Sequence, residues 1–212
     1  MKNIADLRKE YSLQSLEERD AEKNPFLQFE KWWLQALASN IDDVNAMTLA
    51  TANKDGIPSA RIVLLKNYDE AGFVFFTNYL SNKANDLEEN PNAALVFYWK
   101  ELERQVRIKG MVIKVSNSIS DEYFASRPEG SKLGAWASPQ STVIPGRQVL
   151  ESKVNELKSF YADKKISRPA FWGGYVIKPA TIEFWQGRPS RLHDRLQYSL
   201  NENEWRLERL AP

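Results

Sequence analysis

The alternation of apolar and polar residues predicts one helix near the start of the chain and a β-rich region after it. The run NPFLQFEKWWLQALAS has helical spacing, and Asn24 with Pro25 suits an N-cap followed by the first helical position. Residues 1–24 are highly charged and poor in apolar side chains, so we expect a mobile N-terminal segment there. The apolar stripe of the predicted helix consists of Phe26, Phe29, Trp33, Leu34 and Leu37.

Short apolar runs separated by turn residues predict strands in the middle and at the end of the chain. Residues 54–56 are a hairpin turn signal, and turns are also expected at 68–72 and 201–203. Short strands with tight turns favour an antiparallel barrel or sandwich over βαβ units. The predicted strands cover residues 46–52, 57–66, 73–78, 93–100, 104–117, 173–187, 191–200 and 204–210.

Three further helices are expected between these strands. They cover residues 81–90, 120–126 and 147–161, and the polar stretch GAWASPQSTVIPG between the last two is expected to be a loop. No internal repeat, low-complexity stretch or linker interrupts the pattern. We therefore interpret residues 1–212 as a single domain.

Composition limits the function more than it limits the fold. With 29 basic and 28 acidic residues, the net charge of +1 provides no field to attract nucleic acid or an anionic membrane. The absence of cysteine excludes disulfides, thiolate metal sites and cysteine nucleophiles, and a single histidine excludes a multi-histidine metal site. A Ser–His–Asp triad remains formally possible. The start MKNIADLRKEYSL resembles no signal peptide, so we expect a cytoplasmic protein.

Isolated basic residues interrupt the apolar strands. The phosphate-binding glycine motifs are missing, so side chains must hold any phosphorylated ligand. Arg61 and Lys66 lie roughly 17 Å apart in a straight strand, too far to hold one phosphate. Lys83 begins a short helix, where backbone N–H groups favour an anion. An alternative for each of these cations is a position at a strand edge, where the aliphatic part of its side chain covers apolar surface.

Neutral polar residues accompany these cations. Gln105 lies between two arginines in a strand, and Gln140 with Ser141 lies in the polar loop. These side chains can hydrogen-bond a heterocycle or a phosphate. An edge position or an ordinary turn explains them equally well.

The sequence RLHDR is the sharpest candidate site. In a strand, Arg191, His193 and Arg195 share one face, whereas in a helix His193 points away from the two arginines. A neutral histidine there accepts a proton or a hydrogen bond. We favour an anion site over a surface histidine, because cations so close repel one another unless an anion compensates. Trp185 either stacks on a flat ring or packs in the core.

In this order the motifs resemble those of the FMN-dependent pyridoxine/pyridoxamine 5′-phosphate oxidases over nearly the whole chain. The resemblance implies a mainly β structure with flanking helices, an antiparallel, Greek-key-like split β-barrel. It also implies a homodimer with two FMN sites at the subunit interface. The most specific motifs are RIVLLK (61–66), FFTN (75–78), SNKA (81–84), ERQVR (103–107), YFASRP (123–128), SPQS (138–141), FWGG (171–174), IEFWQG (182–187) and RLHDR (191–195).

The resemblance also assigns roles to residues. Many members carry an arginine, usually a ligand of the cofactor phosphate, where this chain has Asn82. Arg191 and His193 are the implied catalytic residues, and the segment from Arg8 to Tyr11 is expected to fold over the substrate. The other implied FMN contacts are Arg61, Ile62, Val63, Leu64, Leu65, Lys66, Phe76, Thr77, Lys83, Gln105, Gln140, Ser141, Trp185 and Arg195. The implied substrate contacts are Arg8, Tyr11, Lys66, Tyr123, Arg127, Ser131, Arg191 and His193.

The implied reaction belongs to vitamin B6 biosynthesis and salvage. Pyridoxamine or pyridoxine 5′-phosphate loses a hydride from C4′ to flavin N5, and O₂ reoxidises the flavin to give hydrogen peroxide. The products are pyridoxal 5′-phosphate and, from the amine, ammonia. Two alternatives remain: a non-catalytic flavin- or haem-binding split barrel, which needs neither RLHDR nor YFASRP, and a nucleic-acid-binding barrel, which the balanced charge disfavours.

Overall fold

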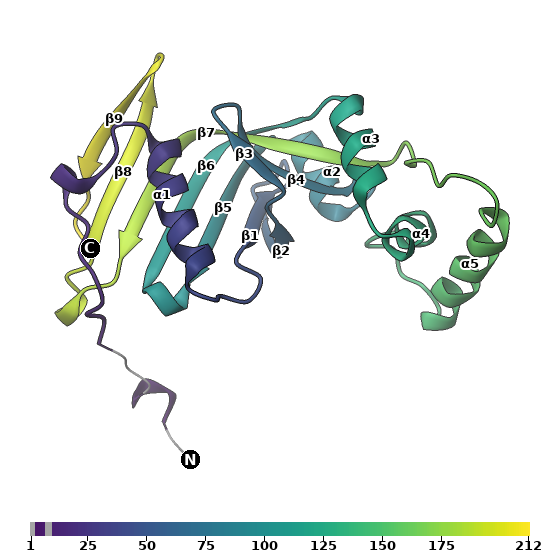
Figure 1. Ribbon diagram of the computed structural model, residues 1–212, viewed down its shortest axis with the longest axis horizontal. Helices are drawn as coiled ribbons and strands as arrows, with labels where there is room; N and C mark the ends of the chain where they lie inside the picture. The colour runs from purple at the N-terminus through teal and green to yellow at the C-terminus, as the bar shows by residue number, and fades with distance from the viewer. Residues whose placement is uncertain (1–2, 7–9) are drawn as a thin grey trace.

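The computed structural model describes residues 3–6 and 10–212, and its strands form one antiparallel sheet (Figure 1). Within this described part, nine strands pair in the order β2-β1-β5-β6-β7-β4-β3, and β8 pairs with both β7 and β9. The mainly β, antiparallel architecture predicted from the pattern is confirmed. The strands are β1 (Ala46–Ala52), β2 (Pro58–Leu64), β3 (Asn67–Asp69), β4 (Gly72–Asn78), β5 (Asn92–Trp99), β6 (Arg104–Lys114), β7 (Trp172–Gln186), β8 (Asp194–Asn201) and β9 (Glu204–Arg209).

The sheet branches along β7. Residues 172–177 of β7 pair with β4, and residues 181–186 pair with β8, while β6 follows its other edge. The register shifts between Lys109 and Gly110, where a Cβ on Gly110 would lie 1.9 Å from the carbonyl oxygen of Lys178. Only glycine allows that close approach of two backbones. One strand therefore joins both parts of the sheet, with Trp172 at its start and Trp185 near its end.

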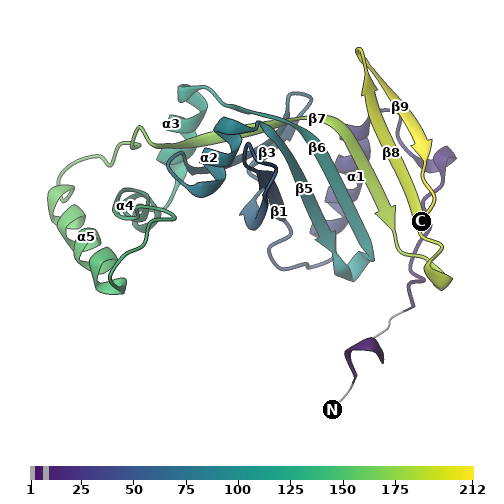
Figure 2. The same cartoon turned by 180° about the vertical axis from the view of Figure 1, so that it is seen from behind.

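Helix α1 (Pro25–Ala38) lies across the sheet, as Figure 2 shows from behind. Its N-cap is as predicted, because the Asn24 side chain accepts the N–H of Phe26 at 2.8 Å. The predicted stripe is wrong in part: Leu34 and Leu37 are 58% and 50% exposed. The side chains that face the core follow the helical repeat more closely and are Phe26, Phe29, Trp32 and Ala36.

Four helices lie at the opposite end of the sheet from β8 and β9 (Figure 1). They are α2 (Asn82–Glu89), α3 (Asn117–Ser126), α4 (Glu129–Ala137) and α5 (Arg147–Phe160). A second hydrophobic cluster holds α3, α4 and α5 together through Phe124, Leu133 and Leu157, with Trp172 from β7. In the described residues, no helix is both long enough and apolar enough to span a bilayer.

Helix α4 is absent from the sequence prediction, which made residues 134–146 a loop. Two glycines lower its helix propensity, but Leu133 and Ala137 are buried in the second cluster and stabilise the helix. The expected turn at 68–72 is also wrong in part, because β3 pairs Tyr68 with Phe73.

The predicted strand over 191–200 begins too early. Arg191 ends a short 3₁₀ helix, Pro189–Arg191, and Ser190 and Arg191 have positive φ values of 55° and 61°. Strand β8 starts only at Asp194, so Arg191, His193 and Arg195 do not share a strand face. The remaining 3₁₀ turns are Ile4–Asp6, Glu18–Asp20 and Lys100–Leu102.

Candidate functional site

A cavity of about 1120 Å³ opens between β2, β4, α3 and α4. It brings together most of the residues that the sequence motifs singled out, from four separate segments of the chain. Its predicted lining residues are Arg61, Ile62, Val63, Leu64, Lys66, Phe76, Thr77, Asn82, Lys83, Tyr123, Arg127, Ser131, Gln140 and Ser141. Those missed by the sequence reasoning are Asn78, Ser126, Pro128, Gly134, Ala135, Ser138 and Trp172.

Arg61 and Lys83 place two positive charges in this cavity. The buried Lys83 donates from Nζ to Thr77 Oγ1 at 3.2 Å and to Ser81 Oγ at 3.1 Å. Its pKa is lowered to about 8, first by burial and then by the nearby Arg61. The Asp86 carboxylate lies 3.8 Å from the Arg61 guanidinium, so it compensates only part of this charge. Two cations drawn together in a half-buried hollow favour binding of an anion.

Arg127 and the aromatic rings around it form a second cationic region. The guanidinium carbon lies 4.6 Å from the centre of the Trp172 ring. Phe76 stacks on Tyr123 at 4.0 Å and on Trp172 at 5.6 Å. Arg127 Nη1 is buried and has no hydrogen-bond partner among the described residues. An unpaired buried donor costs about 1–3 kcal/mol, so this region favours a ligand that supplies an acceptor.

A second group of predicted residues lies away from the cavity. We call it the Trp185 cluster: Tyr11, Gln105, Trp185, His193 and Arg195. Trp185 pairs with Gln105 on one side and with Arg195 on the other. The Trp185 ring lies 4.6 Å from that of His193, and Tyr11 lies 5.7 Å from Trp185 and 5.8 Å from His193.

The cavity and the Trp185 cluster occupy opposite ends of β7. Trp172 lines the cavity, and Trp185 lies thirteen positions further along the same strand. At about 3.3 Å per residue, that separation is up to roughly 40 Å. None of the five cluster residues lines the cavity of the same copy.

Arg195 is held by two acceptors. Its Nε donates to Glu183 Oε1 at 2.9 Å, and Nη1 donates to the carbonyl oxygen of Ala211 at 2.7 Å. The hydrogen bond to Glu183 raises the pKa of Arg195. Glu183 is buried and also accepts from Arg107 Nη1 at 3.2 Å. This carboxylate fixes the direction in which Arg195 presents its guanidinium.

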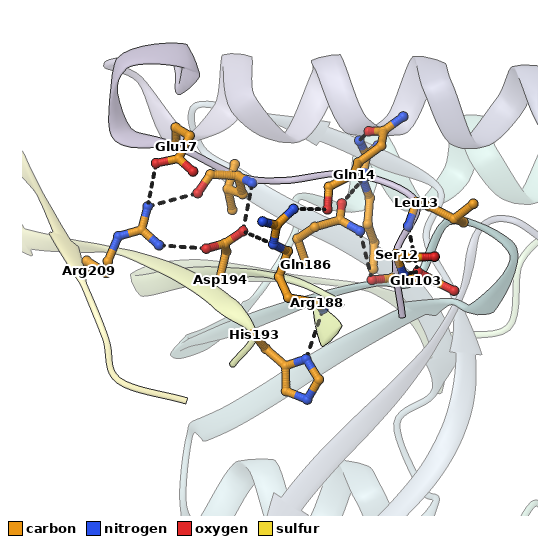
Figure 3. A network of polar contacts seen from close by, with 12 residues as sticks. Ser12, Leu13, Gln14, Glu17, Glu103, Gln186, Arg188, His193, Asp194 and Arg209 are labelled. Atoms are coloured by element: carbon orange, nitrogen blue, oxygen red, sulfur yellow. Dashed lines mark hydrogen bonds and ion pairs between the residues drawn. The ribbon is translucent and has the colours of Figure 1, made fainter. Parts of the chain in front are cut away.

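Residues 10–17, which we call the strap, are bound to the end of the sheet that carries the cluster (Figure 3). The buried Glu103 carboxylate accepts the N–H groups of Ser12 at 2.9 Å and Leu13 at 3.1 Å. Asp194 accepts the N–H of Leu16 at 3.1 Å, and the Leu16 side chain is buried in the core. These contacts hold residues 12, 13 and 16 on the sheet, and the mobility expected over 1–24 stays a prediction.

Arg8, Leu65 and Asn82 differ from the other expected contact residues. Arg8 lies outside the described residues. The Leu65 side chain is buried in the main core and does not line the cavity, so a contact between Leu65 and the cofactor stays a prediction. Asn82, where the resemblance led us to expect arginine, does line the cavity, and its N–H donates to Ser141 Oγ at 3.3 Å.

Known sequences match this chain over nearly its whole length. Residues 34–161 match the family described as pyridoxamine 5′-phosphate oxidase, and residues 172–212 match the pyridoxine 5′-phosphate oxidase C-terminal dimerisation region. The chain is 58% identical over 212 residues to a pyridoxine/pyridoxamine 5′-phosphate oxidase of Nostoc sp., covering 100% of this chain and 99% of that protein. Identity to the protein of the same name from Burkholderia vietnamiensis is 56% over 215 residues, covering 100% of both.

Solved structures show the same fold. PhzG from Burkholderia lata 383, in complex with tetrahydrophenazine-1-carboxylic acid, superposes with a TM-score of 0.89 at 28% identity, covering 96% of this chain and 100% of that one. A pyridoxamine 5′-phosphate oxidase-related, FMN-binding protein from Nostoc punctiforme superposes with a TM-score of 0.71 at 18% identity, covering 89% and 98%. The second likeness concerns the fold alone.

Proposed function

Because the chain belongs to the pyridoxine/pyridoxamine 5′-phosphate oxidase family, we propose that it is an FMN-dependent oxidase of vitamin B6 metabolism. Its substrates are pyridoxamine and pyridoxine 5′-phosphate, and its product is pyridoxal 5′-phosphate. Relatives at 58% and 56% identity, which match over their whole length and are named as oxidases, support this assignment over a non-catalytic flavin- or haem-binding barrel.

The observation that carries the proposal is the presence of two distinct cationic regions in one cavity. Arg61 and Lys83 form one, next to the neutral donors Thr77 and Gln140. Lys66 and Arg127 belong to the other, next to the stacked rings. A cofactor with one phosphate and a substrate with another need two such regions, and a cavity of about 1120 Å³ has room for both.

The residues around Arg61 fit the phosphate of FMN. The partly compensated charge of Arg61 and Lys83 lies beside hydroxyl and amide groups that accept or donate hydrogen bonds. When bound, FMN takes two electrons from the substrate carbon and passes them to O₂, which becomes hydrogen peroxide.

The residues around Arg127 fit the phosphate of the substrate. The unpaired Nη1 of Arg127 would donate to it, with Lys66, Tyr123 and Ser131 on the same cavity wall. The stacked Phe76, Tyr123 and Trp172 make that wall apolar enough to exclude water from the unreactive side of the ligand.

The site is completed by a second copy of the chain. A single copy holds the Trp185 cluster at the far end of β7 from its cavity. The cluster lies within residues 172–212, apart from Tyr11 and Gln105, and this region matches the family's dimerisation region. In the homodimer, we place the cluster of one copy over the cavity of the other, where Arg191 and His193 orient the substrate ring and Gln105, Trp185 and Arg195 contact the flavin.

Peroxide release tests the proposed function. The purified protein should be yellow and should release one hydrogen peroxide for each pyridoxal 5′-phosphate formed from pyridoxamine 5′-phosphate. Arg127→Ala should raise KM strongly while flavin stays bound. Lys132→Ala serves as the control, because the half-buried Lys132 donates from Nζ to the carbonyl oxygen of Ala125 at 2.6 Å and does not line the cavity. A yellow protein without peroxide release would support the non-catalytic alternative instead. Turnover of tetrahydrophenazine-1-carboxylic acid, without turnover of pyridoxamine 5′-phosphate, would support a PhzG-like substrate.

A further inference from the structure

His193 accepts a hydrogen bond from the backbone. The N–H of Arg188 points at the ring nitrogen Nδ1, with 3.1 Å between the two nitrogens (Figure 3). A backbone N–H only donates, so Nδ1 must present its lone pair. In the neutral ring the proton then lies on Nε2, the nitrogen turned away from this network in Figure 3.

The Arg188 side chain holds its own N–H group in this orientation. Its Nε lies 3.4 Å from Asp194 Oδ2, and its Nη1 donates to the carbonyl oxygen of Gln14 in the strap at 3.3 Å. Asp194 is fixed in turn by Arg209 Nη1 at 2.8 Å. The chain from Arg188 to Asp194 therefore forms a loop closed at both ends, and His193 lies inside it.

The donor and acceptor nitrogens of the His193 ring are reversed relative to those of the histidine in a Ser–His–Asp triad. In a triad, an aspartate accepts the proton of Nδ1–H, and Nε2 is left free to act as the base. Here the neighbouring carboxylate, Asp194, contacts Arg188, Arg209 and Leu16 instead of the ring. The triad that the composition left open is therefore excluded for His193.

We propose that His193 acts in this enzyme as a hydrogen-bond donor through Nε2–H, and that the group it meets is an anionic oxygen of the ligand. The substrate identity rests on the proposed function, whereas the proton position follows from the Arg188 contact alone. Trp185 and Tyr11 pack against the ring and limit its rotation. A fixed donor orients a bound anion and stabilises its charge, but it does not remove a proton.

Nitrogen NMR tests the proton position directly. His193 is the only histidine in the chain, so ¹⁵N-histidine labelling gives one pair of ring nitrogens without any assignment. In the FMN-loaded enzyme, at a pH where the ring is neutral, we expect Nδ1 to resonate as an unprotonated nitrogen and Nε2 as a protonated one. A proton on Nδ1, or averaging of the two resonances, would overturn the proposal. Neither result depends on oxidase activity, so failure here is separate from failure of the proposed function.

Ligand titration of the same sample identifies the oxygen. Inorganic phosphate and pyridoxal 5′-phosphate are added separately while the Nε2–H resonance is followed. A shift with both ligands indicates a phosphate oxygen, and a shift with pyridoxal 5′-phosphate alone indicates an oxygen on the ring. No shift with either ligand would overturn the donor role.

Two variants separate a donor from a base. His193→Gln keeps an N–H donor near the position of Nε2 but has no basic nitrogen, whereas His193→Leu has neither. If His193 is a donor, His193→Gln should retain kcat/KM about ten- to hundredfold above that of His193→Leu, because a hydrogen bond to a charged group is at stake. Equal loss in both variants, with flavin retained, would contradict the proposal.

Discussion

Tyr11 packs against Gly187 so closely that a Cβ at position 187 would lie 2.7 Å from the Cβ of the tyrosine. The contact joins the strap to the turn after β7, next to Trp185. The atom that would clash is the Cβ of Tyr11, which moves only if the backbone moves. Tyr11 can therefore occupy its position in the Trp185 cluster only because residue 187 is glycine.

Gly187→Ala should displace Tyr11 from the cluster. We expect kcat/KM for pyridoxamine 5′-phosphate to fall about tenfold, the loss of one good contact of about 1.4 kcal/mol, with FMN affinity nearly unchanged. Steady-state kinetics and a flavin titration measure the two effects. Gly130→Ala is the matched control, because a Cβ there meets no atom within 4 Å. Wild-type kinetics in Gly187→Ala would show that Tyr11 does not act on the substrate.

Glu183→Gln should weaken FMN binding, although Glu183 is not itself an expected contact of the cofactor. The buried carboxylate is shared by Arg107 and Arg195, and a neutral amide would orient both guanidiniums less firmly. We expect the Kd for FMN to rise about tenfold, corresponding to about 1–2 kcal/mol for a charge-assisted hydrogen bond. Fluorescence titration of released flavin measures this change. The control is Glu208→Gln on β9, where the half-buried carboxylate pairs with Arg206 at 3.0 Å. An unchanged Kd in Glu183→Gln would remove Glu183 from the positioning of Arg195.

The lowered pKa of Lys83 gives the protein a pH dependence of known sign. The folded pKa of about 8 lies below the ordinary 10.5, so between these values the unfolded chain binds more protons. The free energy of unfolding of the FMN-free protein should therefore rise with pH across this window. Binding of the FMN phosphate needs the protonated amine, so FMN affinity should fall above about pH 8.

Lys83→Met isolates these two effects. In this variant, thermal unfolding of the FMN-free protein should lose the rise between pH 8 and 10.5, and the Kd for FMN should be weaker but less dependent on pH. Both are measured in matched buffers at constant ionic strength. A rise in stability that persists in Lys83→Met would assign it to another group.

Hybrid dimers test the sharing of the site between two copies. Arg127→Ala damages the cavity, and His193→Leu damages the Trp185 cluster, so each variant alone should be nearly inactive. In an equal mixture after subunit exchange, half of the dimers are hybrids with one intact site, and about a quarter of wild-type activity should return. Confirmed hybrids without activity would show that each site is built from one chain.

Local sequence patterns were sufficient for most strands and for some of the cations that line the cavity. Residues 46–52 form β1 as predicted, because alternation and a KDG turn agree with the pairing that the sheet requires. Arg61 and Lys66 could be found because cations in an apolar strand conflict with the local pattern, and such conflicts mark functional positions. Tyr123, Arg127 and Ser131 were expected only from the family resemblance. Trp172 was missed because a tryptophan in a strand is also expected in the core.

The rest depends on information that periodicity does not contain. Alternation suggested a strand through Arg191, but Pro189 and two positive φ values form a 3₁₀ turn there. The contacts of the strap could not be predicted, because Glu103 and Asp194 accept its backbone N–H groups, which no side-chain pattern reveals. The Leu34 side chain was placed on the wrong helical face because a leucine next to Trp33 fits either face.

Strand β7 has a consequence for how the two sites of the proposed dimer behave. Each copy runs without interruption from the wall of one cavity, at Trp172, to the cluster that closes the other cavity, at Trp185. We predict that a ligand that shifts one end of this strand displaces the other end as well. The two flavins would then sense each other's occupancy, and their binding isotherm would depart from that of independent sites.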